Sequence, residues 1–140
     1  MRILKQAAAA VLVAGAAAAG TIAAAAPAAA ATYNNECGAG YAVVNSANIG
    51  STGTVFLTYN SSTKRNCAIT KRNTAGSTVL IEVGLSVSPK GNHWDAFEGG
   101  QFTSYAGPIY LSAAGRCVDW GGRINNPNGS WTGKNGTNCG

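Results

Sequence analysis

The sequence has few of the side chains that catalysis and metal binding require. Its 140 residues include one histidine, His93, and only five Asp or Glu residues. No Cys-x-x-Cys pair is present, so the ligand spacing of a typical zinc site is missing. A serine hydrolase would use His93 as its base, but there is no Gly-x-Ser-x-Gly motif to supply the nucleophile. The sequence therefore predicts no catalytic residue, no metal and no cofactor, and His93 is interpreted as a turn residue.

Three of the acids leave a hydrolase as a remaining alternative. A glycosidase needs two carboxylates that face each other across about 5 to 10 Å. Asp95, Glu98 and Asp119 lie in segments that flank the central loops, so they are the candidates for such a pair. We expect the first two to be solvated beside a Gly-Gly turn. Asp119 lies between Val118 and Trp120, which favours a buried hydrogen-bond acceptor or a partner for a nearby arginine.

The N-terminal segment has the three parts of a secretory leader. A short basic start is followed by an alanine-rich stretch, by Pro27 and by further small residues up to Ala31. A retained membrane anchor is not expected, because the stretch is mostly alanine and no Lys or Arg follows it before Lys64. Residues 1–31 are therefore predicted to be a signal peptide that is cleaved after Ala31, and the protein is predicted to be secreted.

Cleavage would leave residues 32–140 as a single mature domain. The whole chain has 10 Lys or Arg and 5 Asp or Glu residues, and the loss of Arg2 and Lys5 leaves a net charge of 8 − 5 = +3. Such a mildly basic domain is not a polycation, and no specific nucleic-acid partner is expected.

All four cysteines lie in the predicted mature domain. An even number in a small exported chain favours two disulfides, because the extracytoplasmic space allows them to persist. Four cysteines allow three pairings, and the sequence alone does not select one. We expect Cys37 to pair with Cys67 and Cys117 with Cys139, since each bond then closes a short local loop.

The mature domain has the period of two that is typical of β-strands. Between Thr78 and Ser88 alternate residues are apolar, which predicts one half-buried strand. No segment has a convincing helical period. Short strands separated by turn signals predict an all-β fold, either a small antiparallel sandwich or a barrel-like domain with two disulfides.

Shorter runs predict the rest of the fold. One hairpin is expected to join residues 54–60 to 67–70, and another to join 109–112 to 117–120. Gly99-Gly100 is predicted to turn the chain between two further short strands. Residues 121–140 are rich in Asn and Gly and are predicted to form an irregular tail that Cys139 ties down.

Six stretches form an ordered set across essentially the whole mature domain. They are Cys37-Gly-x-Gly-Tyr41, Gly53-Thr-Val-Phe-Leu-Thr-Tyr-Asn60, Asn66-Cys67, Tyr105-Ala-Gly-Pro-Ile-Tyr110, Cys117-Val-Asp-Trp-Gly-Gly122 and Cys139-Gly140. Together they resemble the spore-associated protein A family of actinomycetes, which are small exported proteins. The resemblance implies an extracellular protein associated with spores or aerial growth. It implies no activity and supplies no catalytic residue.

Aromatic and asparagine side chains indicate a possible sugar-binding surface. Sugar rings stack on aromatic faces, and Asn or Asp side chains can then fix their hydroxyl groups. Of Trp94, Trp120 and Trp131, the last lies in a loop of Asn, Gly and Lys and is the best candidate for exposure. We expect Trp131, Asn128 and Asn135 to form a shallow glycan-binding surface.

Lys64, Arg65, Lys71 and Arg72 place four positive charges on one predicted hairpin. Extracellular polyanions such as wall polymers are candidate partners for such a patch. The ordinary interpretation is a solvated hairpin, in which lysine also discourages edge-to-edge aggregation.

Three functions remain compatible with the sequence. The first is a secreted, non-catalytic protein of the spore or hyphal surface, with cell-wall or spore-surface polymers as partners. The second is a carbohydrate-binding module, and the third is an inhibitor of an extracellular protease with residues 61–65 as its reactive loop. An enzyme ranks behind all three.

Overall fold

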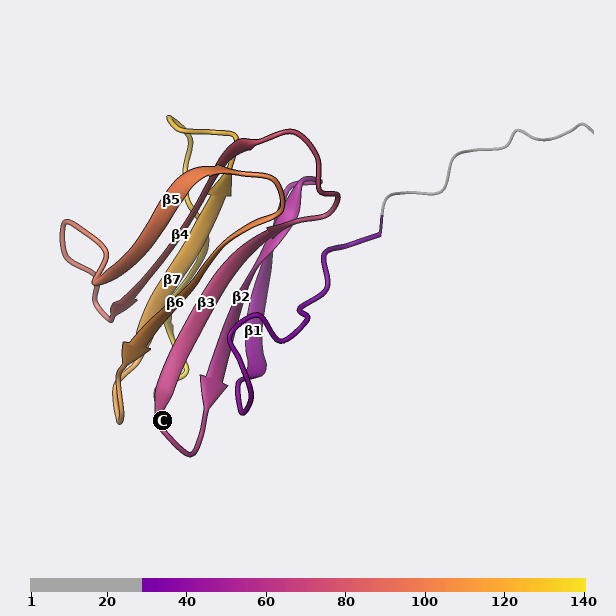
Figure 1. The fold of residues 1–140 in the computed structure, drawn as a ribbon. Helices are drawn as coiled ribbons and strands as arrows, with labels where there is room; N and C mark the ends of the chain where they lie inside the picture. Colours follow the sequence, from indigo (N-terminus) through magenta and orange to yellow (C-terminus); the bar gives the residue numbers. More distant parts are fainter. Residues whose placement is uncertain (1–28) are drawn as a thin grey trace, which may run out of the picture.

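The computed structural model describes residues 29–140 as two antiparallel sheets packed face to face (Figure 1). The predicted signal peptide lies outside the described residues except for its last three, 29–31. The strands of the described part are β1 (Ala42–Ile49), β2 (Gly53–Asn60), β3 (Arg65–Arg72), β4 (Val79–Val87), β5 (Ala96–Phe102), β6 (Tyr105–Ser112), β7 (Val118–Ile124) and β8 (Thr132–Thr137).

The first sheet has the strand order β1-β2-β3-β6, and the second sheet has the order β5-β4-β7-β8. Every pair of neighbouring strands is antiparallel. Residues 29–140 contain no helix, and hence no helix of the length and apolar character needed to span a membrane. The predicted all-β fold is confirmed, in its form of an antiparallel sandwich.

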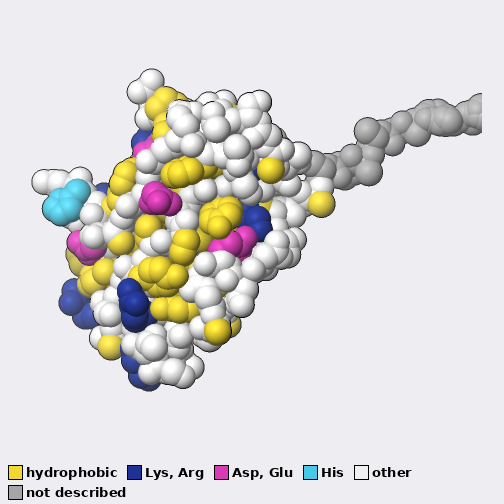
Figure 2. Space-filling view, viewed as in Figure 1, with side chains coloured by type: hydrophobic (Ala, Val, Ile, Leu, Met, Phe, Trp, Pro, Cys, Tyr) yellow, Lys and Arg dark blue, Asp and Glu magenta, His cyan; other side chains and the backbone are white. Residues whose placement is uncertain are grey.

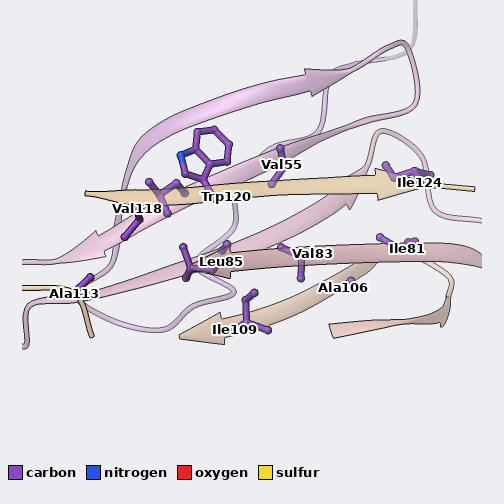
Figure 3. Packing of buried hydrophobic residues seen from close by; sticks show 12 residues of the cluster. Val55, Ile81, Val83, Leu85, Ala106, Ile109, Ala113, Val118, Trp120 and Ile124 are labelled. Carbon is purple, nitrogen blue, oxygen red and sulfur yellow. The ribbon is translucent and has the colours of Figure 1, made fainter. Parts of the chain in front are cut away.

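The core lies between the sheets because apolar residues alternate along the strands. Ile81, Val83 and Leu85 of β4 are fully buried, as the apolar face of the predicted strand requires. They share one cluster with Val55 of β2 and Trp120 of β7, so both sheets contribute to it (Figure 3). The residues between them on the same strands face outward, where a surface site can form.

Residues 31–37, which we call the strap, lie over the outer face of the first sheet (Figure 1). Tyr33 packs against Phe56 with their ring centroids 6.1 Å apart. Glu36 forms an ion pair with Lys71 at the end of β3. A second apolar cluster therefore covers the first sheet from outside.

Both predicted disulfides are confirmed. The Cys37–Cys67 bond joins the strap to β3, and the Cys117–Cys139 bond joins the C-terminal segment to the residue before β7. No cysteine of the described chain is free. The two bonds thus attach the segments at the two ends of the described chain to opposite sheets.

The predicted hairpin of residues 109–112 with 117–120 is wrong. The first segment belongs to β6, which pairs with β3, and the second belongs to β7, which pairs with β4. The intervening turn, in which the Arg116 N–H donates to the Ala113 carbonyl at 2.9 Å, carries the chain from one sheet to the other. Both strands face the same core, so their alternation is compatible with either arrangement.

Two further predictions of irregular structure are wrong. Gly99 and Gly100 do not form a turn, since they lie within β5 opposite residues of β4. The predicted irregular tail, 121–140, contains the end of β7 and all of β8, which pair with each other. Glycine allows β7 and β8 to approach closely, because a Cβ at Gly133 would lie 1.9 Å from the Trp120 carbonyl oxygen. Side chains there would push the strands apart.

Candidate functional site

A row of glycines crosses the outer face of the second sheet. Gly84 of β4 lies opposite Gly121 of β7, which lies opposite Gly133 of β8. On the other side of Gly84, the residue opposite it is Phe97 of β5, which lies at the end of this row. These positions alternate with the buried core residues, so they face outward. A row without side chains leaves room for large rings to lie on the sheet.

Three aromatic side chains, Trp94, Phe97 and Trp131, gather on this face and are called the aromatic triad. The ring centroids of Trp94 and Trp131 are 5.0 Å apart, and those of Phe97 and Trp131 are 6.1 Å apart. Trp94 lies directly on Gly84, because a Cβ at that position would be 2.2 Å from the indole. Phe97 is 51% exposed and both tryptophans are half-buried. The triad is thus a partly exposed aromatic surface.

Arg123 of β7 holds Trp131 and its loop in place. The guanidinium carbon lies 4.7 Å from the centroid of the Trp131 ring. The same group pairs with Glu82 of β4 at 2.8 Å, and its Nη1 donates to the carbonyls of Pro127 and Gly129, both at 2.9 Å. Those carbonyls belong to the loop that leads to Trp131. Arg123 is therefore a positioning residue for the triad.

A hollow of about 250 Å³ lies beside the two tryptophans. Its lining residues are Lys90, Trp94, Trp120, Trp131, Gly133 and Asn135. The lining combines aromatic walls with polar groups in similar proportion, and the hollow is smaller than most ligand sites, whose volumes usually range from about 300 to 1,000 Å³. The size of the hollow therefore suits one small unit of a larger ligand.

Asp119 of β7 holds the two segments that carry the polar lining residues Lys90 and Asn135. Its buried carboxylate accepts the N–H of Lys90 at 2.7 Å and the N–H of Gly136, the residue after Asn135, at 2.8 Å. Burial raises the pKa of Asp119, but hydrogen bonds from the Ser88 hydroxyl and the two backbone N–H groups, together with the positive charge of Lys90, outweigh it, and the pKa lies below its ordinary value. The charged carboxylate therefore ties the loop after β4 to β8.

Two of the three predicted glycan-binding residues lie at this surface. Trp131 belongs to the aromatic triad, and Asn135 lines the hollow. Asn128 is exposed in the loop between β7 and β8 and is not among the lining residues.

The four predicted polyanion-binding residues are not brought together. Lys64 and Arg65 lie at the start of β3, whereas Lys71 and Arg72 lie at its end, about 23 Å away at about 3.3 Å per residue. Arg65 stacks on a tyrosine of β6, Lys71 pairs with the strap, and Arg72 donates to two backbone carbonyls. Figure 2 shows Lys and Arg side chains scattered over the visible face rather than gathered in one patch.

The candidate residues for hydrolysis do not form a catalytic group. The three acids accept hydrogen bonds from the backbone, and the histidine lies on an exposed loop. His93 is exposed on the loop between β4 and β5, which stands out from the body at the left of Figure 2. The carboxylates of Asp95 and Glu98 accept backbone N–H groups of β4 and β6, and Asp119 is bonded as described above. Within residues 29–140 there is no group of three or more His, Cys, Asp or Glu side chains that could hold a metal ion.

The predicted glycan-binding surface includes Trp131 but not Trp94, Phe97 or Lys90, although the structure brings these residues together. They meet because β5 pairs with one side of β4 while β7, far along the chain, pairs with the other. The available signal was Gly84, which interrupts the polar face of the predicted strand with a position that has no side chain.

Fold and site together define a small disulfide-linked β-sandwich with an exposed aromatic surface on one sheet. The chain is 50% identical over 109 residues to "Spore-associated protein A" of Streptomyces coelicolor, an alignment that covers 78% of this chain and 68% of that protein. The chain therefore belongs to the spore-associated protein A family, as the sequence predicted. The name of this relative indicates an association with spores and does not denote an enzyme. No family model matches the chain, and no solved structure matches it.

Proposed function

We propose that this chain is secreted and is retained on the spore or hyphal surface because its aromatic triad binds a wall glycan. The observation that carries the proposal is the placement of Trp94 on Gly84 of the second sheet, with its ring centroid 5.0 Å from that of Trp131. The name of the relative supports the proposed association with spores, and the chemistry of the surface supports the proposed kind of ligand.

Sugar rings match this surface in two ways. A pyranose presents an apolar face of C–H groups, to which a rigid aromatic ring offers a large contact area at low cost in conformational entropy. Its hydroxyl groups need hydrogen-bonding partners, and Asn135 and Lys90, whose side chains can supply them, line the hollow beside the aromatic rings. An aromatic surface with polar groups at its edge therefore favours a sugar over a wholly apolar ligand.

The proposed role is binding without a chemical reaction. Each of the three candidate acids, Asp95, Glu98 and Asp119, already accepts a hydrogen bond from the backbone, which supports a structural use of these carboxylates. The proposed partners are polymers of the wall or spore surface, with neither a membrane anchor nor a nucleic acid involved.

The alternative of protease inhibition has less support. The Asn60 side chain accepts the N–H groups of Ser62 at 3.0 Å and Thr63 at 3.2 Å, and the Lys64 N–H donates to the Asn60 carbonyl at 2.8 Å. Residues 61–64 are thus a closed turn between β2 and β3. Peptide recognition along a cleft or sheet edge uses an extended segment instead.

Retention on purified cell walls tests the proposal. Trp131→Ala removes one ring of the triad and is expected to weaken retention by about tenfold or more, as for an aromatic hot spot. Tyr105→Ala is the matched control, because this residue is 36% exposed but lies on β6 of the first sheet. Equal retention of the Trp131 variant and the unaltered protein would rule out the triad as the binding surface.

A further inference from the structure

We propose that Lys90 is the specificity-determining residue of the hollow, and that it selects a glycan whose stacked sugar carries a carboxylate or phosphate group. This inference rests on the proposed function, since the triad supplies the stacking to which Lys90 adds a charge.

The Lys90 ammonium is available to a ligand. It lies 4.9 Å from the centroid of the Trp94 ring and donates to the neutral carbonyl of Gly91 at 3.1 Å. The ion pairs found within residues 29–140 involve Lys71 and Arg123 and do not include Lys90. An ammonium has three donor positions, so capacity remains for an anionic group.

Other cations near the hollow are engaged elsewhere. Arg123 donates to Glu82 and to two backbone carbonyls. The Lys134 ammonium donates at 2.8 Å to the side chain of Asn45 on β1, at the edge of the first sheet. Lys90 is thus the cation that lines the hollow itself.

The carboxylates around the hollow do not repel an anionic ligand from its lining. None of the lining residues is acidic. Asp119 is 5% exposed and binds two backbone N–H groups, Asp95 binds a backbone N–H of β4, and Glu82 is paired with Arg123. A sugar in the hollow therefore meets an amine and an amide, which suits an acidic substituent.

The position of Lys90 is fixed relative to the ring on which the sugar would stack. Its backbone N–H is held by Asp119 at 2.7 Å, while its ammonium lies over Trp94. A ring stacked against the tryptophans would hold its substituents beside this cation. A charge-assisted hydrogen bond is roughly twice as strong as a neutral one, so the charge discriminates between acidic and neutral sugars.

Calorimetric titration of the mature protein tests the inference with three soluble ligands. They are a neutral chitin oligosaccharide, a glycan strand with muramic-acid carboxylates, and a glycerol-phosphate oligomer. The variant is Lys90→Gln, and the control is Lys64→Gln, which removes the same charge at an exposed turn of the first sheet. Lys90→Gln is expected to weaken binding to at least one acidic ligand by about tenfold, which is the loss of one charge-assisted hydrogen bond. Its binding to the neutral ligand should be unchanged.

Each outcome has a definite meaning. Loss on the carboxylate ligand alone or on the phosphate ligand alone identifies the source of the acidic group and supports the inference. Equal affinity of Lys90→Gln and Lys64→Gln for all three ligands overturns it. If the neutral ligand binds as tightly as the acidic ones and Trp131→Ala abolishes binding to all, the inference fails while the proposed function stands. If Trp131→Ala changes nothing, the proposed function itself fails.

Discussion

At Gly84 the absence of one carbon atom decides where the Trp94 ring can lie. An added Cβ would lie 2.2 Å from the indole, well inside van der Waals contact. The same face carries Phe97, whose ring occupies the space above Gly99 in the same way, with 2.7 Å between the ring and the position of an added Cβ. The triad therefore depends as much on these two glycines as on the aromatic residues.

Gly84→Ala is expected to displace Trp94 from the sheet. Overpacking of this kind costs about 1 to 3 kcal/mol in the free energy of unfolding, and glycan retention should fall with it. Urea unfolding and a wall-retention assay measure the two effects. Gly91→Ala is the control, because a Cβ there has nothing within 4 Å, and its effect should stay within about 0.5 kcal/mol. A Gly84 variant as stable and as well retained as this control would contradict the packing described here.

Asp119 makes the stability of the domain depend on pH. Its folded-state pKa is lowered, so its contribution is present above the unfolded-state value of about 3.9 and is lost as the pH falls through the folded-state pKa. Glu36 contributes in the same direction: burial raises its pKa, but the hydrogen bonds from Lys71 and the backbone outweigh this, and its pKa is also lowered.

Asp119→Asn should lower stability at pH 7 by about 2 kcal/mol, because an amide cannot replace the charged acceptor of two backbone N–H groups. The variant should also lose less stability than the unaltered protein on acidification below about pH 4. Urea midpoints at pH 7 and pH 3 check both effects. Parallel acid curves for the two proteins would show that Asp119 does not carry this pH dependence.

At the scale of the elements, the strap lies away from the proposed site, whereas β8 forms part of it. The strap is attached to β3 by Cys37–Cys67 and covers the first sheet, away from the triad. The Cys117–Cys139 bond lies just beyond β8, the strand that carries Gly133 and Asn135 at the hollow. Removal of the two disulfides should therefore have different effects on glycan binding.

Replacing Cys37 and Cys67 by serine should lower stability by about 3 kcal/mol, as the loss of one disulfide that closes a loop of this size does. Glycan affinity of the folded fraction should remain. The corresponding pair of changes at Cys117 and Cys139 should also release β8 and weaken glycan binding. Hydrogen exchange of β8 amides and titration with wall glycan distinguish the two variants. If both bind glycan alike, β8 does not shape the site.

Sequence patterns predict elements better than they predict partners. The strand from Thr78 to Ser88 was visible because its apolar alternation is a local property, and it became β4 with the expected buried face. The pairing of β6 with β3 and of β7 with β4 is non-local, and alternation is the same whichever strand lies alongside. For that reason the predicted hairpin of residues 109–120 was wrong.

The neighbours within the candidate site could be predicted to the same limited extent. Trp131 and Asn135 could be selected because an Asn- and Gly-rich loop favours exposure, and both lie at the surface described here. Lys90 and Trp94 lie beside Trp131 only because of the strand register, which places Gly84 of β4 between Phe97 of β5 and Gly121 of β7. No local composition specifies that register.

On the scale of the whole molecule, the two sheets share one core but have different outer faces. The strap covers the first sheet (Figure 1). The aromatic triad and its hollow lie on the second sheet. Under the proposed function, the protein attaches to a wall polymer through the outer face of the second sheet. Its opposite face then stays outward, closed by the strap.

The partition of the protein between culture medium and purified spore walls tests the central proposal most directly. The unaltered protein, a Trp94→Ala/Trp131→Ala variant and the Tyr105→Ala control are expressed in the same strain and measured in both fractions. We predict that the unaltered protein and the control remain with the walls, while the double variant is folded and oxidised but appears in the medium. Wall retention of the folded double variant at the level of the unaltered protein would contradict the account.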